Sequence, residues 1–106
     1  MAKGLYLAFT HPRDDESDAA MNRWYSTRHL PEILALDGVT NGQRYRSLQS
    51  DPMYRYLAAY TLDGDLPEIV ARIHADSPNR TPTATTRTSP APEFRLFEFV
   101  EEQQSG

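Results

Sequence analysis

The sequence has no cysteine, no excess of positive charge and no long apolar run. Without cysteine, disulfides, thiolate nucleophiles and Cys-ligated zinc are excluded, and the composition fits a reducing compartment such as the cytoplasm. The 11 basic and 15 acidic side chains give a net charge of -4, whereas nucleic-acid binding draws on a basic excess. A membrane span needs roughly 20 apolar residues in succession. We therefore expect a soluble cytoplasmic protein that binds neither nucleic acid nor membrane.

Sites for common cofactors are also missing from the sequence. Only five glycines are present, and they are scattered rather than gathered into a phosphate-binding loop. The three histidines, His11, His29 and His74, are widely separated and do not have the spacing of zinc or iron ligands. We expect no metal and no cofactor, although His11 and His74 remain weak candidates for a site.

The length of 106 residues predicts one domain covering residues 1–106. Alternation of apolar and polar residues predicts four strands, and apolar residues at helical spacing predict two helices. Pro31 is expected to end or kink the first helix, and Asp65 to cap the second. The expected strands cover residues 3–10, 39–48, 54–62 and 93–100, and the helices lie within residues 14–36 and 66–73.

The order β-α-β-β-α-β predicts a ferredoxin-like α+β fold, with a four-stranded antiparallel sheet and both helices on one face. The other sheet face would carry aromatic and aliphatic residues, so we expect a homodimer that packs sheet against sheet. Residues 77–92 are rich in proline and threonine and predict an extended loop, either a lid or an arm across the partner subunit. Residues 102–106 are expected to be frayed.

The densest group of candidate site residues lies near the end of the first helix. Tyr25 and His29 are four residues apart, as are Trp24 and Arg28, so their side chains can converge. The unperturbed pKa of histidine, about 6.5, suits proton transfer near neutral pH. We therefore predict His29, Tyr25 and Arg28 as catalytic and Trp24 as substrate-binding. The alternative is that His29 only hydrogen-bonds a main-chain carbonyl.

Further candidates lie on the predicted strands, where tyrosine is frequent. Tyrosines and arginines there could line a cavity beneath the helices and hold an oxygen-bearing ligand. The alternative is that the tyrosines fill the core or an interface and that the arginines pair with surface acids. The strand residues predicted to bind substrate are Tyr6, Arg44, Tyr45, Tyr56, Tyr60 and Phe97.

The helix-end cluster has a recognisable pattern of two aromatics, three residues, histidine, one residue and proline, formed by Trp24, Tyr25, His29 and Pro31. An Asp-Gly-Val turn and an Arg-Tyr strand follow it. This pattern resembles the EthD-like branch of the dimeric α/β-barrel superfamily.

The resemblance covers residues 3–62 by pattern and the remainder by topology. It implies a dimeric α/β barrel and carries over one functional residue, His29, with Trp24 and Tyr25 as its neighbours. The superfamily includes polyketide cyclases, quinone-forming monooxygenases, lyases, isomerases and haem-degrading enzymes, so the resemblance does not select a reaction.

The first functional hypothesis is a cofactor-independent lyase, isomerase or cyclase that acts on an aromatic or polyketide-like metabolite. His29 would move a proton, Tyr25 and a strand tyrosine would hydrogen-bond an oxygen, and Arg28 or Arg44 would stabilise its charge. Alternatives are a cofactor-free monooxygenase and a haem-linked monooxygenase with His74 as axial ligand. A further alternative is a non-catalytic ligand-binding or accessory dimer in a catabolic or biosynthetic pathway.

Overall fold

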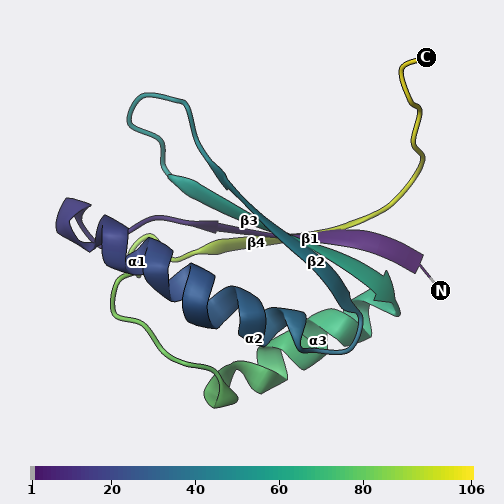
Figure 1. The fold of residues 1–106 in the computed structure, drawn as a ribbon, viewed down its shortest axis with the longest axis horizontal. Coiled ribbons are helices and arrows are strands. Elements are labelled where there is room, and N and C mark those ends of the chain that lie inside the picture. Colours follow the sequence, from purple (N-terminus) through teal and green to yellow (C-terminus); the bar gives the residue numbers. More distant parts are fainter. Residues whose placement is uncertain (1) are drawn as a thin grey trace.

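The computed structural model describes residues 2–106, which form one antiparallel sheet with helices on one of its faces (Figure 1). The strand order in the sheet is β2-β3-β1-β4, as the ferredoxin-like prediction requires. The strands are β1 (Ala2–Thr10), β2 (Val39–Arg46), β3 (Tyr56–Gly64) and β4 (Glu93–Glu98). The helical elements are η1 (Asp15–Ser17), α1 (Asp18–Trp24), η2 (Tyr25–His29), α2 (Leu30–Leu34), α3 (Leu66–Asp76) and η3 (Ser77–Asn79).

The strand register fixes which residues face the helices. Tyr6 of β1 pairs with Tyr60 of β3 on one side and with Leu96 of β4 on the other. The residues at even positions of β1, including Tyr6, are buried, and Leu5 on the opposite face is 38% exposed. On β3, Tyr56 and Tyr60 are buried on the helix side.

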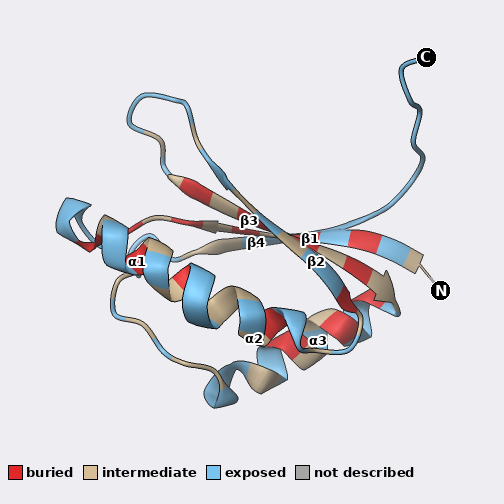
Figure 2. Ribbon diagram, in the orientation of Figure 1, coloured by how far each residue is buried: buried red, intermediate tan, exposed pale blue. Residues whose placement is uncertain are grey.

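The core lies between the sheet and the helices, where the buried residues of Figure 2 face one another. Met21, Ile33 and Leu62 are 0–2% exposed. The α3 helix begins as predicted, because the Asp65 carboxylate accepts a hydrogen bond from the backbone N–H of Glu68 at 3.1 Å. The helices are therefore positioned by apolar burial and by a side-chain cap.

The first helix differs from the prediction at Pro31. The helix continues from α1 through α2, because residues 25–29 form a π-helical turn and the N–H of Leu30 bonds to the carbonyl of Tyr25, five residues earlier. Proline has no N–H and its ring clashes with the carbonyl four residues before it in an α-helix. The wider turn removes this conflict, so the prediction that the helix ends at Pro31 is wrong.

Several strand boundaries also differ from the predicted ranges. The last hydrogen bond of the β1–β4 edge joins Phe99 to Lys3 at 2.8 Å, and β4 ends at Glu98 rather than residue 100. The β2–β3 pairing stops after the bond between Ser47 and Arg55, which leaves a longer hairpin loop than expected. The exposed residues 101–106 extend away from the sheet (Figure 1).

Residues 77–92 return from α3 to β4 across the open end of the helical layer, after the short η3 turn (Figure 1). The segment is fastened to the N-terminal half of the same chain. The N–H of Arg13 bonds to the Thr85 carbonyl at 2.7 Å, and the N–H of Arg87 bonds to the His11 carbonyl at 2.8 Å. The segment therefore covers its own subunit, and main-chain bonds fix part of this contact.

Candidate functional site

A cavity of about 300 Å³ lies between the sheet and the helices, on the side covered by residues 77–92. Its size is at the lower end of the range for small-molecule sites, about 300–1,000 Å³. Phe94 at its wall is 46% exposed, so the cavity is open to solvent at this edge. The cavity lining includes the aromatic, histidine, hydroxyl-bearing and arginine side chains of Tyr6, Thr10, Trp24, Tyr25, His29, Tyr60, His74, Arg80 and Phe94.

The π-helical turn brings Trp24, Tyr25 and His29 together at the cavity. The rings of Trp24 and His29, five residues apart, are stacked with centroids 4.4 Å apart, and Tyr25 meets His29 edge-on at 5.0 Å. An α-helix would place Trp24 above Arg28 instead, because its turn has 3.6 residues. The extra residue of the π turn therefore selects His29 as the neighbour of Trp24, and Arg28 lies exposed and outside the cavity.

The indole of Trp24 stacks on His29 with its face and is held by a hydrogen bond at its Nε1 edge. Its Nε1 donates a hydrogen bond to the carbonyl of Thr81 at 3.0 Å. Thr81 in turn donates to the Glu32 carboxylate, from its N–H at 3.1 Å and from its hydroxyl at 3.1 Å. The 77–92 segment is thereby connected to α2 and holds the indole against His29.

Three hydrogen-bonding groups in the cavity have no partner. The Nδ1 atom of His29 and the hydroxyl of Tyr60 are both buried without a hydrogen bond, as is the hydroxyl of Thr10. Leaving such a group unpaired costs about 1–3 kcal/mol. A cavity with several unpaired polar groups on aromatic walls is suited to a ligand that carries oxygen atoms.

Burial sets the charge state of these groups. It lowers the pKa of His29 to about 4, an effect strengthened by the positive charge of Arg80 and opposed by Glu32. Burial also raises the pKa values of Tyr60 and Tyr25. At neutral pH the imidazole is therefore uncharged and the phenols are protonated, so His29 can accept a proton and Tyr60 can donate a hydrogen bond.

His74 and Tyr6 form a second polar pair in the same cavity. The Tyr6 hydroxyl lies 2.9 Å from Nε2 of His74, and the Tyr6 ring stacks on Phe94 with centroids 5.9 Å apart. Burial raises the pKa of Tyr6. His74 was only a weak candidate in the sequence because its partner is 68 residues distant, and no local spacing could reveal the pair.

Arg80 is the charged residue of the lining that sequence reasoning missed, along with Thr10 and Phe94. It belongs to the Pro- and Thr-rich segment, whose composition suggested only a loop. Its guanidinium donates from Nη1 to the Ile73 carbonyl at 2.7 Å and to the Asp76 carboxylate at 3.2 Å. The signal that could have found it is its position four residues after Asp76, a spacing that permits an ion pair on a helix.

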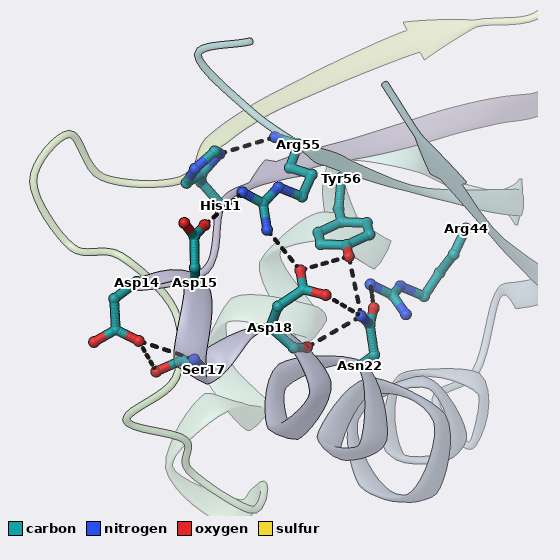
Figure 3. A network of polar contacts seen from close by, with 9 residues as sticks. All are labelled: His11, Asp14, Asp15, Ser17, Asp18, Asn22, Arg44, Arg55 and Tyr56. Atoms are coloured by element: carbon teal, nitrogen blue, oxygen red, sulfur yellow. Dashed lines mark hydrogen bonds and ion pairs between the residues drawn. The ribbon is translucent and has the colours of Figure 1, made fainter. Parts of the chain in front are cut away.

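Arg44 and Tyr56 do not line the cavity. They belong to a polar network between the sheet and α1 (Figure 3). The Tyr56 hydroxyl donates to Oδ1 of Asp18 at 2.6 Å and accepts from Nδ2 of Asn22 at 3.0 Å. Nη2 of Arg44 donates to Oδ1 of Asn22 at 2.9 Å, and its guanidinium carbon lies 4.3 Å from the centre of the Tyr25 ring. Arg44 therefore contacts the site through Tyr25, without lining it.

Two further predicted residues lie on the opposite sheet face. Tyr45 pairs with Leu57, Phe97 pairs with Leu5, and the two aromatic rings are 51% and 53% exposed. The alternation of the strands turns them away from the helices. The structure thus gathers Tyr6, Trp24, Tyr25, His29 and Tyr60 around the cavity and leaves Tyr45 and Phe97 outside it.

Other hollows lack such a combination of groups. A larger and more open one of about 730 Å³ lies where α3 begins, beside Leu96 and Glu98, and has no histidine or tyrosine in its wall. Among residues 2–106, no three His, Asp or Glu side chains are grouped to hold a metal ion. No helix in this same range is long and apolar enough to cross a membrane.

Neither a protein-family model nor a curated protein matches the sequence. Solved structures match over nearly the whole chain. An inferred monooxygenase from Shewanella loihica PV-4 has a TM-score of 0.63 at 12% identity, over 95% of this chain and 97% of that chain. An EthD family protein from Bacillus halodurans C-125 has a TM-score of 0.60 at 12% identity, over 94% of this chain and 100% of that one. A dimeric protein of unknown function from Bacteroides fragilis NCTC 9343 has a TM-score of 0.56 at 14% identity, over 93% and 98%.

These similarities define the class of fold. The Bacteroides fragilis protein is described as ferredoxin-like, and the chain shares this α+β architecture and that of the EthD family protein. The fold predicted from the helix-end pattern and the element order is therefore confirmed. Identities of 12–14% extend to the fold alone, and the reaction has to be argued from the site.

Proposed function

We propose that this protein is a small-molecule enzyme of the lyase, isomerase or cyclase type, and that His29 transfers the proton. The observation that carries the proposal is that His29 Nδ1 and the Tyr60 hydroxyl line one aromatic cavity, both buried and both without a partner. Such groups are costly for folding, and a ligand with a carbonyl or hydroxyl oxygen would satisfy them.

The chemistry follows from the charge states. A neutral imidazole can take a proton from an acidic C–H beside a carbonyl of the ligand, and the Tyr60 hydroxyl can donate to the oxygen on which negative charge develops. The imidazolium formed is stabilised by that same negative charge, which offsets the desolvation that lowers the pKa of His29. Returning the proton to another carbon completes an isomerisation. In a cyclisation the enolate carbon instead attacks a second carbonyl carbon of the ligand, and the proton goes to the oxygen of that carbonyl. The aromatic walls suit an aromatic or polyketide-like ligand.

A haem-linked monooxygenase is less well supported. Nε2 of His74, the atom expected to bind iron, is 2.9 Å from the Tyr6 hydroxyl. The cavity of about 300 Å³ is small for a drug-sized ligand, and a porphyrin would have to displace the 77–92 segment. The residues present therefore do not fit a haem. A cofactor-free monooxygenase would use the same cavity and the same His29, with oxygen as co-substrate.

The test measures exchange of a carbon-bound proton for deuterium in cyclic diketones and hydroxylated aromatic ketones, followed by NMR. We expect His29→Gln to lower the exchange rate by about 10²–10⁴-fold while ligand affinity changes little. An exposed substitution on the same helix, Arg23→Gln, should leave the rate unchanged. A His29→Gln variant that exchanges at the full rate would disprove the catalytic role and leave a ligand-binding or accessory protein.

We also propose that the chain forms a homodimer through the open sheet face. Leu5, Phe97 and Phe99 lie on this face and are 38%, 53% and 56% exposed. Exposed apolar surface of this kind marks an interface, and the Bacteroides fragilis protein with the same fold is dimeric. Light scattering after gel filtration should give a dimer for the wild type and a monomer for Phe97→Glu. Leu34→Glu, which changes a similarly exposed leucine on α2, is the control and should remain dimeric.

A further inference from the structure

Arg80 places a largely buried positive charge in the wall of the cavity. Its side chain is 12% exposed, against 25% for its partner Asp76. Both of its hydrogen bonds are made by Nη1, to the Ile73 carbonyl at 2.7 Å and to Asp76 at 3.2 Å. These bonds hold the guanidinium at the C-terminal end of α3, where it shares the cavity with His29 and Tyr60.

No acidic side chain lines this cavity. Its titratable groups besides the tyrosines are His29, His74 and Arg80, although the chain as a whole has a net charge of -4. Two carboxylates lie just outside the lining: that of Asp76 pairs with one nitrogen of the guanidinium, and that of Glu32 acts on the charge of His29. Asp76 compensates part of this charge through Nη1 alone, and in a site that is partly removed from water the guanidinium attracts a further anion more strongly than it would on the surface.

The neighbouring groups are affected by this charge. Burial lowers the pKa of His29 and Arg80 lowers it further. Burial raises the pKa values of Tyr60 and Tyr6, and the Arg80 charge opposes both increases. An ionised oxygen in the cavity would lie within the same field.

We propose that the cavity selects a planar ring compound bearing one negatively charged oxygen, and that Arg80 binds this oxygen. This inference rests on the proposed function, because it concerns the ligand of the same site. The charged oxygen is either a carboxylate that the ligand carries or the enolate or phenolate left when a proton departs. Trp24 and Phe94 supply flat apolar contact for the ring, and the unpaired Tyr60 hydroxyl supplies a second donor.

The probes are benzoate and benzamide, which have the same ring and nearly the same shape but differ in charge. Trp24 is the single tryptophan of the chain and lines the cavity, so its fluorescence reports binding there. A hydrogen bond to a charged group is worth about 1.5–3 kcal/mol. We therefore expect the wild type to bind benzoate at least about tenfold more tightly than benzamide.

Two substitutions should change this preference in opposite directions. Arg80→Met keeps an unbranched apolar stem but removes the guanidinium and its charge, and should abolish the preference for benzoate. Asp76→Asn removes the carboxylate that competes for the guanidinium, and should increase benzoate affinity severalfold with little effect on benzamide. Arg23→Met removes one positive charge from the exposed surface of α1, and should keep the wild-type preference.

A second probe distinguishes a carboxylate from an oxygen anion on the ring. The visible absorbance of 4-nitrophenol reports its ionisation, and in the wild-type cavity this ionisation should occur at lower pH than in free solution. If only benzoate shows a charge preference, Arg80 serves a ligand carboxylate. If only the nitrophenol ionisation shifts, Arg80 serves the enolate or phenolate.

The outcomes separate this inference from the proposed function. Equal affinity for benzoate and benzamide, with no shift of the nitrophenol, would overturn the role of Arg80 and leave the aromatic cavity intact. Failure of all three ring compounds to bind would count against the cavity itself. If Arg80→Met does not fold, the Asp76→Asn variant decides, because unchanged or weaker benzoate binding there contradicts the proposal.

Discussion

The low pKa of His29 predicts how the stability of the protein depends on pH. The unfolded chain has a histidine of pKa 6.5, and burial lowers this pKa to about 4 in the folded state. Between these values the unfolded state binds the proton more readily, so stability is present above about pH 6.5 and falls as the pH decreases toward 4. Protonation of this one residue should lower the free energy of unfolding by about 2 kcal/mol at about pH 5 compared with about pH 7.5.

The assay compares urea unfolding of the wild type and His29→Gln over this pH range, followed by the fluorescence of Trp24. Glutamine does not titrate, so the variant should lose about 2 kcal/mol less than the wild type between about pH 7.5 and pH 5. The carboxylates of the chain act equally on both proteins and cancel in the difference. His11→Gln is the matched control and should retain the His29 contribution. Parallel pH profiles for the wild type and His29→Gln would refute the desolvated state of His29.

Two other substitutions test the unpaired hydroxyl and the polar network. Tyr60→Phe removes the buried hydroxyl that has no partner, so it should raise the free energy of unfolding by up to about 1 kcal/mol while it weakens ligand binding; urea unfolding with and without benzoate measures both. Asp18→Asn weakens the bonds from Tyr56 at 2.6 Å and Arg55 at 2.8 Å and should cost about 1–2 kcal/mol near neutral pH. The Tyr56 hydrogen bond lowers the pKa of Asp18, with a further contribution from Arg55, so the difference from the wild type should vanish only as the pH falls through this lowered pKa.

The fold could be predicted because strands and helices have different periodicities that one sequence displays. Alternation along β1 and apolar spacing in α3 specify the elements directly, and the Asp65 cap marks the start of α3. The boundary at Pro31 could not be predicted in this way. The preference of proline against an α-helix is a local rule, whereas the π turn that accommodates it also depends on the packing of Met21 and Ile33 against the sheet.

Helical spacing and strand composition pointed to several residues of the candidate site, including Tyr6 and Tyr60, but not to the contacts between distant segments. Tyr25 and His29 are four residues apart on one helix, so their spacing indicates their convergence, whereas Trp24 meets His29 only through the π turn. Tyr6 and His74 are 68 residues apart and meet only through the register of β1 beside α3. Arg80 lies in a segment without periodicity, so its place at the cavity is set by the connection to α3, which composition does not show.

The features of the cavity that oppose stability depend on one another. The π turn resolves the conflict at Pro31 and at the same time places Trp24 on the imidazole of His29. This stacking helps to bury the imidazole, and burial is the main cause of its low pKa. The Thr81 carbonyl holds Trp24 in place, so the 77–92 segment helps to keep His29 neutral without contacting its unpaired Nδ1 atom. Departures from local rules, such as the π turn and the buried, unpaired His29, gather at sites that bind or react. Because the π turn and the 77–92 segment together maintain the state of His29, we infer that both serve the function of the cavity.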